Sequence, residues 1–574
     1  MTNKQENNED IYLREGVHFL SKGFISEAKE SFNNALKYNP KSSPALHNLG
    51  LISLRSNNLL RARELLEKSV GLNPSVETYT ILGECYEKMG EHQNALVCYK
   101  IILKNFPKKI PIIIKSASLF ETLGKFEKAI KLYYKIVQNE PENTEISIKL
   151  AWLLWKKNRH DAIEILEKCL LLNKTNTLKK IKILSVLILF KEWSFRIKNN
   201  KLPYHALSID DIFFKSTSDI LLQLDNESSI LLEEFKDHPQ AYMIKGIVNF
   251  VRKKNQNAQD FFDMVSKYSN NKMTRAIRFD NEFFSHLNDF DTIKLIKHLP
   301  KLLEVKERNI FENDIIYLSC NSDYFNYFTK PLLLSINNQT EKTSVHIHIM
   351  DSDTRHTEYA LDFCSLLTNI DISISVERPK LPPNDINYAR SYFHAIRFIR
   401  LYQHLLKFKK RLWLMDVDAL FNQSPKFLFN KFKNKDISLR IRPARLEPWN
   451  QFNACLFGVN YSKRAINYLH KIAAYIAYFH QNAELPWGID QLAMYASYNN
   501  IDTKNKPSIG FMDDKVLDYE YNKDGLVWCS SGSIKFAALN KSRIKNNEEV
   551  TPYELRFENY NNKIEMLDEK LNSG

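Results

Sequence analysis

Lys41–Pro74 reads KSSPALHNLGLISLRSNNLLRARELLEKSVGLNP, and this segment decides the fold of the first half of the chain. Gly50 and Ala62 are small residues within it, and the bulky Leu66 follows Ala62 by one helical turn. The segment recurs along the chain, and each copy closes on a proline: Pro40, Pro74, Pro107 and Pro141. Spacings of 34, 33 and 34 residues are those of stacked two-helix hairpins.

The neighbouring segments repeat the same small and bulky positions. Those of the first, third and fourth segments are Gly16, Ala28 and Phe32; Gly83, Ala95 and Tyr99; and Ala117, Ala129 and Tyr133. Small residues where paired helices approach, aromatic residues between them and a closing proline resemble the tetratricopeptide repeat (TPR) family. Ser53 departs from this pattern, because the other segments have an aromatic residue there. We expect Leu54 to fill that hairpin instead.

Further units extend the helical region. A fifth begins at Thr144 and lacks the closing proline, and a sixth occupies residues 240–268. We therefore predict TPR repeats over residues 9–175 and a helical region with one more TPR-like unit over residues 176–305, together forming an α-solenoid. A hairpin cannot bury its apolar face alone, so stacking supplies the core and leaves an extended concave surface. That surface is where we expect a protein or glycan partner to bind.

Composition narrows the class of protein. The chain has 574 residues, enough for several domains, of which 44% are hydrophobic. Its most apolar run, Ile183–Phe190, is much shorter than the roughly 20 residues that cross a bilayer, so we expect no transmembrane segment. MTNKQENNED at the N-terminus does not resemble a secretory signal, which predicts a cytoplasmic protein. The seven cysteines contain no C-x-x-C pair, and the net charge of +14 comes without an aromatic-basic motif, so we expect no nucleic-acid partner.

The sequence pattern changes after about residue 309, and we predict an α/β domain over residues 310–540. Short β-prone runs at Ile315–Ser319, Val345–Met350 and Asp371–Glu377 precede a long amphipathic helix over residues 388–408. A strongly apolar strand follows in Leu412–Phe421, LWLMDVDALF. Strands that alternate with helices predict a largely parallel sheet, and ligands bind at the carboxyl ends of such strands.

Asp416 and Asp418 form a D-x-D pair at the end of that apolar strand. Alternate side chains of an extended segment project to the same face, so two carboxylates can hold a divalent cation such as Mn²⁺ or Mg²⁺. Such a cation would neutralise a diphosphate leaving group. A solvated turn at the strand end explains the same two residues without any ligand.

The region from Asp314 to Lys535 resembles the nucleotide-sugar glycosyltransferases with the GT-A (Rossmann-like) fold, particularly family 8. Six segments carry the resemblance in a consistent order: DIIYLSCNSDYF, VHIHIMDSD, AIRFIRL, LMDVDALF, FNACLFGVN and WGIDQLAMYASY. Two positions depart from the family pattern. Cys455 stands at the glycine of an F-N-x-G segment, and Ser530 replaces the histidine ligand of a late H-x-G-x-x-K segment that keeps Gly532 and Lys535.

The resemblance implies a metal-dependent hexosyltransferase and a role for each matching residue. Asp416 and Asp418 would bind the metal ion, and Asp490 and Gln491 would orient the transferred sugar. The residues that would hold the nucleotide-diphosphate sugar are Cys320, Asn321, Asp323, Arg397, Arg400 and Lys535. Retention of anomeric configuration is also implied, whereas the sugar, the nucleotide and the acceptor stay open.

Other residues that could suggest a binding site also have structural explanations. We expect His346 and His348 to lie in the core rather than to bind metal, and Asp351 and Asp353 to form a turn. Arg440, Arg442 and Arg445 fit an exposed basic turn somewhat better than an anion site. Trp449 and Trp487 fit burial and sugar stacking equally well, and residues 541–574 are expected to form a C-terminal tail or helix.

Two functions of different classes follow. The first is a glycosyltransferase whose acceptor is recruited by the TPR solenoid. The second is a TPR interaction scaffold with a catalytically degenerate GT-A-like domain, which the serine at position 530 favours and the intact D-x-D pair opposes.

Overall fold

A computed structural model describes residues 8–155, 157–198, 218–235, 237–252, 254–269, 271–307, 312–382, 385–441, 447, 452–519, 521–529, 562–567 and 569. Its residues form two compact units, one of which ends at Leu172 while the other begins at Asn173.

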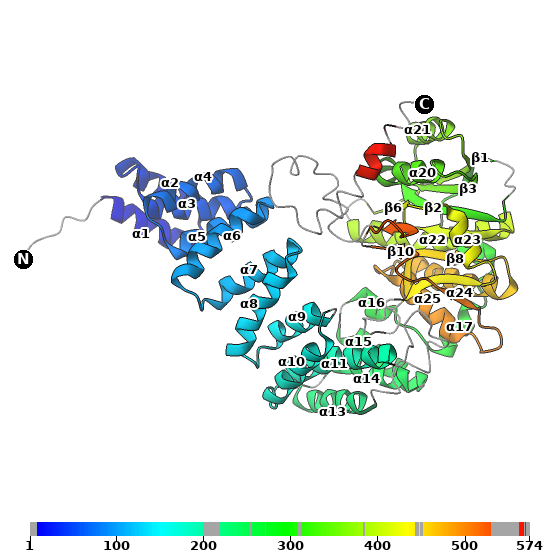
Figure 1. Cartoon of the computed structure of the whole chain (residues 1–574), viewed down its shortest axis with the longest axis horizontal. Helices are drawn as coiled ribbons and strands as arrows, with labels where there is room; N and C mark the ends of the chain where they lie inside the picture. Colours follow the sequence, from blue (N-terminus) through cyan, green and yellow to red (C-terminus); the bar gives the residue numbers. More distant parts are fainter. Residues whose placement is uncertain are drawn as a thin grey trace, which may run out of the picture. The chain divides into compact units, whose positions relative to one another are not determined.

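Helix hairpins stacked in sequence order form the N-terminal unit (Figure 1). The hairpins are α1 (Asn8–Ser21) with α2 (Ile25–Tyr38), α3 (Ser43–Arg55) with α4 (Leu59–Leu72), α5 (Val76–Met89) with α6 (His92–Asn105), α7 (Ile110–Thr122) with α8 (Phe126–Asn139), and α9 (Thr144–Trp155) with α10 (Arg159–Leu172). The hairpins predicted from the 33- and 34-residue spacing are thus confirmed, including the fifth, which has no closing proline.

The repeated small residues allow the two helices of a hairpin to approach closely. A Cβ atom on Gly83 would lie 2.5 Å from the ring of Tyr99, which is fully buried. The second hairpin replaces the aromatic residue as expected, because Leu54 is buried while the hydroxyl of Ser53 donates to the carbonyl of Leu49 at 2.8 Å.

The second unit begins with helices that continue into the α/β domain. They are α11 (Thr177–Lys198), α13 (Ser218–Glu234), α14 (Pro239–Val251), α15 (Asn255–Tyr268), α16 (Lys272–Arg275), α17 (Asn281–Leu287) and α18 (Thr292–Ile296). The sixth repeat-like unit is the α14–α15 hairpin. Phe262 of α15 shares one hydrophobic core with Phe283 of α17 and with Tyr475 of α24 (Lys463–Gln481). These helices therefore pack as part of the second unit.

An eight-stranded mixed sheet organises the α/β domain, in the order β1-β4-β3-β2-β5-β8-β7-β9. The strands are β1 (Leu303–Lys306), β2 (Asp314–Asn321), β3 (Thr343–Met350), β4 (Ile370–Glu377), β5 (Arg411–Met415), β7 (Ile437–Ile441), β8 (Phe452–Val459) and β9 (Ile509–Phe511). Strands β4, β3, β2 and β5 are parallel, whereas β1 runs antiparallel to β4 and β8 runs antiparallel to both β5 and β7.

The prediction of a largely parallel sheet is thus correct only for part of the sheet. Fewer than a dozen residues separate the end of β7 at Ile441 from the start of β8 at Phe452. A parallel crossover needs about a dozen residues or more, so β8 pairs with β7 in the antiparallel direction. The alternation of strands and helices in the sequence did not reveal this short connection.

Helices cover the sheet on both faces. Helix α22 (Ile386–Phe408) and α24 lie over one hydrophobic core, and α20 (Lys330–Asn337) and α21 (Thr354–Ser365) lie over the other. A small sheet, in the order β10-β11-β6, consists of β10 (Leu517–Asp518), β11 (Val527–Cys529) and β6 (Ala419–Phe421). Residues 562–567 are helical, and Ile564 packs on Leu420 and Trp528 of this small sheet.

None of the helices in the described part of the chain is both long enough and apolar enough to cross a membrane.

Candidate functional site

The D-x-D pair follows the carboxyl end of β5, an internal strand of the large sheet, and precedes β6 of the small sheet. Strand β5 ends at Met415, and the backbone N–H of Asp416 donates to the carbonyl of Cys455 in β8 at 2.7 Å. Strand β6 begins at Ala419, which pairs with Cys529 of β11. Both aspartates are thereby held by backbone pairing on either side, and Asp418 is 4% exposed.

Arg397 of α22 joins two predicted site residues that are far apart in the sequence. Its Nη1 lies 2.5 Å from Oδ1 of Asp416, and its Nη2 lies 3.4 Å from Oδ2 of Asp490. The same Nη2 donates to the carbonyl of Ala454 at 3.3 Å. Burial alone would lower the pKa of Arg397, but the two carboxylates raise it above its ordinary value. The guanidinium therefore stays charged inside the domain.

The Asp490–Gln491 pair lies in the first turn of α25 (Ile489–Asn500). Gly488 precedes it with a φ of +83°, a left-handed conformation that glycine adopts without strain. The carboxylate of Asp490 accepts from the N–H of Gln491 at 2.9 Å and is buried, whereas Gln491 is half-buried. Asp490 thus has its orientation fixed by its own helix and by Arg397.

Cys455, Cys529 and Tyr519 lie beside the aspartates, although no role was expected for them from the sequence. The hydroxyl of Tyr519 lies 3.1 Å from Sγ of Cys455 and accepts from Nδ2 of Asn453 at 3.3 Å. The pKa of Cys529 is raised well above its usual range, first by its hydrogen bond with Cys455, then by burial and by the charges of Asp418 and Asp416. Cys455 lies within a motif segment, but nothing in the sequence around Tyr519 signals a site.

The predicted nucleotide-binding turn follows β2, which pairs in parallel with β5. The turn therefore lies at the same end of the strands as Asp416. Cys320 is buried, and burial raises its pKa to about 12. The side chain of Asn321 accepts from the N–H of Tyr324 at 2.9 Å and so caps the short helix α19 (Ser322–Tyr324). Asp323 is exposed.

Arg400 lies apart from this group although it is only one helical turn from Arg397. Its Nε donates to Oε2 of Glu377 at 2.7 Å, and its Nη2 donates to the carbonyl of Pro300 at 2.7 Å. The structure therefore brings together Arg397, Asp416 and Asp490 but does not bring Arg400 to them.

Several other residues singled out in the sequence can now be placed. Asp353 caps α21 by accepting from the N–H of His356 at 2.7 Å, in agreement with the expected turn. Arg440 lies in β7 rather than in the expected exposed turn, its side chain is 15% exposed, and it pairs with Asp514 at 2.5 Å. Trp487 is 58% exposed, and its ring centroid lies 4.2 Å from that of His394. His346 and His348 are fully buried, as expected, and Asp351 accepts from the N–H of Ser322 at 2.9 Å. Six others lie outside the described residues: Ser530, Gly532, Lys535, Arg442, Arg445 and Trp449.

Comparison with known proteins identifies the repeats. Tetratricopeptide repeat family models match residues 13–77 and residues 77–109, so the N-terminal unit contains TPR repeats. No curated protein matches the chain.

Three solved structures are similar to parts of this chain at identities below 25% and TM-scores of 0.30 or less. The MamA protein is 23% identical with a TM-score of 0.28, over 30% of this chain and 95% of its own. YrrB, described as a TPR protein with an unusual peptide-binding site, is 17% identical with a TM-score of 0.27, over 30% of this chain and 92% of its own. A TPR protein from Parabacteroides merdae is 15% identical with a TM-score of 0.30, over 47% of this chain and 96% of its own.

Proposed function

We propose that the α/β domain is a GT-A-type glycosyltransferase that moves a sugar from a nucleotide-diphosphate sugar to an acceptor. One observation carries the proposal: Asp416 and Asp490 share the buried guanidinium of Arg397 at the carboxyl edge of the parallel strands. The resemblance to family 8 assigned these three residues to one active site from three separate segments. Their meeting in space supports that assignment.

The chemistry follows from the charges at this edge. Asp416 and Asp418 would hold Mn²⁺ or Mg²⁺, which would offset the negative charge of the departing diphosphate. Arg397 holds the Asp416 carboxylate in place and supplies positive charge where the leaving group develops its own. Asp490 and Gln491 would orient the sugar, and Asn321 with Asp323 would contact the nucleoside.

The TPR repeats are the part of the chain to which we assign acceptor binding. TPR repeats generally expose a concave surface that binds another protein. We therefore propose that the N-terminal unit recruits a protein or a glycan-bearing acceptor, and that this tethering raises the local acceptor concentration without altering the chemical step.

Donor hydrolysis by the full chain tests the proposal. A panel of nucleotide-diphosphate sugars is incubated with and without Mn²⁺, using the unaltered chain, Asp416→Asn, Asp418→Asn and the matched control Asp353→Asn. Asparagine also caps helices well, so the control keeps α21 intact while it changes an aspartate of the other D-x-D pair. We expect one donor to be hydrolysed by the unaltered chain and the control but at least ~100-fold more slowly by the other two variants, since each loses a metal ligand.

Absence of hydrolysis with every donor would favour the second function, a TPR scaffold with a degenerate domain. One structural observation favours this alternative: Arg397 already neutralises the Asp416 carboxylate, as a metal ion would. Equal hydrolysis by all variants would instead remove the metal assignment from Asp416 and Asp418.

A further inference from the structure

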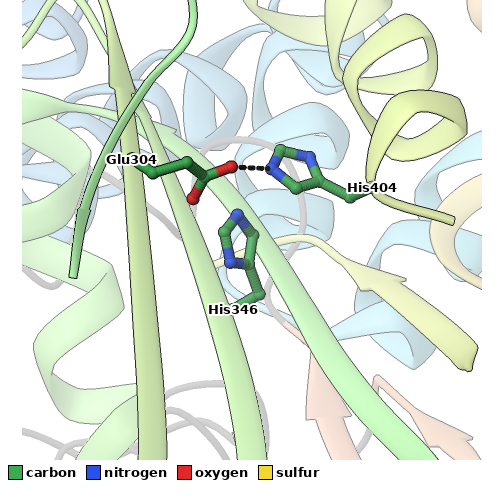
Figure 2. A group of neighbouring side chains, drawn as sticks. All are labelled: Glu304, His346 and His404. Carbon is green, nitrogen blue, oxygen red and sulfur yellow. Dashed lines mark ion pairs between the residues drawn. The ribbon is translucent and has the colours of Figure 1, made fainter. Parts of the chain in front are cut away.

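Glu304, His346 and His404 meet in the interior of the α/β domain, on the face of the sheet covered by α22. They come from β1, β3 and α22, and their candidate ligand atoms all lie within 4.8 Å of one another. Both histidines are fully buried, and the Glu304 side chain is 22% exposed. Figure 2 shows the Glu304 carboxylate facing the His404 ring, with a nitrogen of His346 pointing toward them from below.

We propose that Glu304, His346 and His404 bind one Zn²⁺ ion, at a site separate from the D-x-D pair. Two imidazoles and one carboxylate are a donor set that zinc prefers. The fourth position of a tetrahedral ion would be taken by a water molecule.

The hydrogen bonds around His404 leave a nitrogen for the metal. Its Nδ1 lies 2.9 Å from the carbonyl of Arg400 and 3.2 Å from the hydroxyl of Tyr317. The carbonyl can only accept whereas the hydroxyl can also accept, so the shorter contact favours a proton on Nδ1 and a lone pair on Nε2. Nε2 is buried and meets no hydrogen-bond partner of good geometry among the described residues, although Oε1 of Glu304 lies 3.4 Å from it. A metal-binding histidine typically donates its other N–H to a backbone carbonyl in this way.

The position of Glu304 fits the same ion. Its Oε1 lies 3.4 Å from Nε2 of His404, and ligand atoms of a tetrahedral Zn²⁺ with bonds of about 2.0–2.1 Å are roughly 3.3 Å apart. Lys407 lies 3.0 Å from the same carboxylate oxygen and also 3.0 Å from Oε1 of Glu307, so its single positive charge is shared between two carboxylates. A lone pair on Nε2 facing a carboxylate at this distance is unfavourable unless a cation lies between them.

His346, which was expected from the sequence to lie in the core rather than to bind metal, can supply the third ligand atom if one of its ring nitrogens exchanges a serine hydroxyl for the ion. Its Nδ1 and Nε2 lie 2.8 Å and 2.9 Å from the hydroxyls of Ser373 and Ser375. The Ser375 hydroxyl also lies 3.0 Å from Nδ1 of His348, so it keeps a partner if Nε2 of His346 turns to a metal ion.

The site would join three elements that the sequence keeps far apart. Strand β1 is the antiparallel edge strand that leads from α18 into the sheet, β3 is internal, and α22 carries Arg397. A zinc ion at this point would fasten the edge strand and the helix to the sheet, so its role would be structural.

Metal binding to the full chain tests the proposal. After treatment with a chelator, the unaltered chain is titrated with Zn²⁺ by calorimetry and with Co²⁺ by visible absorption, because tetrahedral Co²⁺ absorbs strongly. Glu304→Gln, His346→Gln and His404→Gln remove the ligands one at a time. His348→Gln is the matched control, since His348 is equally buried on the same strand face, and Asp416→Asn controls for the D-x-D pair.

We expect about one equivalent of tight Zn²⁺ and a tetrahedral Co²⁺ spectrum in the unaltered chain and both controls. Each ligand variant should bind Zn²⁺ at least ~10-fold more weakly and lose the Co²⁺ spectrum. The absence of a tetrahedral Co²⁺ spectrum from the unaltered chain would overturn the proposal. This test does not depend on whether the ligand variants fold. Tight binding that survives His404→Gln would overturn it as well, and so would binding abolished by His160→Ala, which alters the exposed His160–Asp161–Glu164 cluster of α10.

Discussion

Arg397→Met tests whether the guanidinium holds the candidate site together. The side chain is 5% exposed and pairs with Asp416 and Asp490, so the variant leaves two carboxylates without their shared cation. Breaking a buried ion pair by removing one partner costs about 3–5 kcal/mol. The second unit has roughly 400 residues, and unfolding entropy of about 2.1 cal/mol/K per residue gives about 0.8 kcal/mol/K. We therefore expect its Tm to fall by about 4–6 °C in metal-free buffer.

A double-mutant cycle measures the interaction directly. Arg397→Met combined with Asp416→Asn leaves only Asp490 unpaired, so the double variant should be more stable than the sum of the single losses predicts, by about 1–2 kcal/mol. Arg397→Lys is the matched control, because it keeps the charge and should lose less. Calorimetric unfolding of the second transition provides the readout, and Mn²⁺ should stabilise Arg397→Met more than the unaltered chain.

Strict additivity in this cycle, or a Tm within about 1 °C of the unaltered value for Arg397→Met, would refute the shared ion pair.

Three further predictions concern pH, domain boundaries and the metal ligands. Burial alone would raise the pKa of Glu377, but His348 and Arg400 lower it from 4.5 to about 2. The ionised carboxylate therefore contributes about 3 kcal/mol of stability above pH 4.5, and this contribution is lost as the pH falls toward 2. Glu377→Gln should consequently make the free energy of unfolding depend less on pH over that range. A fragment from Asn173 onward should be soluble and keep donor hydrolysis. A fragment from residue 305 onward should aggregate in size-exclusion chromatography, because it loses α15 and α17, which share a hydrophobic core with α24. A soluble and active fragment from residue 305 would contradict the role of that shared core. Ser530→His should tighten Mn²⁺ binding in calorimetry with a nucleoside diphosphate, because Cys529 pairs with Ala419 next to Asp418; an unchanged affinity would show that position 530 does not face the metal.

The repeats were predictable because their signal is local and recurs. A small residue such as Gly83 and a large one such as Tyr99 face each other within one hairpin, and the same pair returns in the next hairpin. Strands β2, β3 and β4 and helix α22 were predictable for a related reason, since each is a single run with a clear apolar period.

Pairings between distant segments were not predictable in the same way. The antiparallel neighbours of β8 and the small sheet around β6 depend on connections that have no apolar period of their own. The three-residue strand β11 is too short to stand out, yet it pairs with the end of the D-x-D segment. The shared core of α15, α17 and α24 was hidden because a repeat-like hairpin reads the same whether it packs on another hairpin or on a sheet domain.

The arrangement along α22 explains why a motif search finds the aspartates but not what positions them. Arg397, Arg400 and His404 are three and four residues apart, a spacing that places them on one stripe of a helix. The stripe reaches Asp416 after β5, Glu377 at the end of β4 and Glu304 in β1, so polar contacts join one helix to residues of three strand segments. Because only the first of these contacts touches the candidate donor site, the other two act on it by fixing the rotation and position of the helix. Substitutions at Glu377 should consequently change the placement of Arg397 without removing any group that meets the donor.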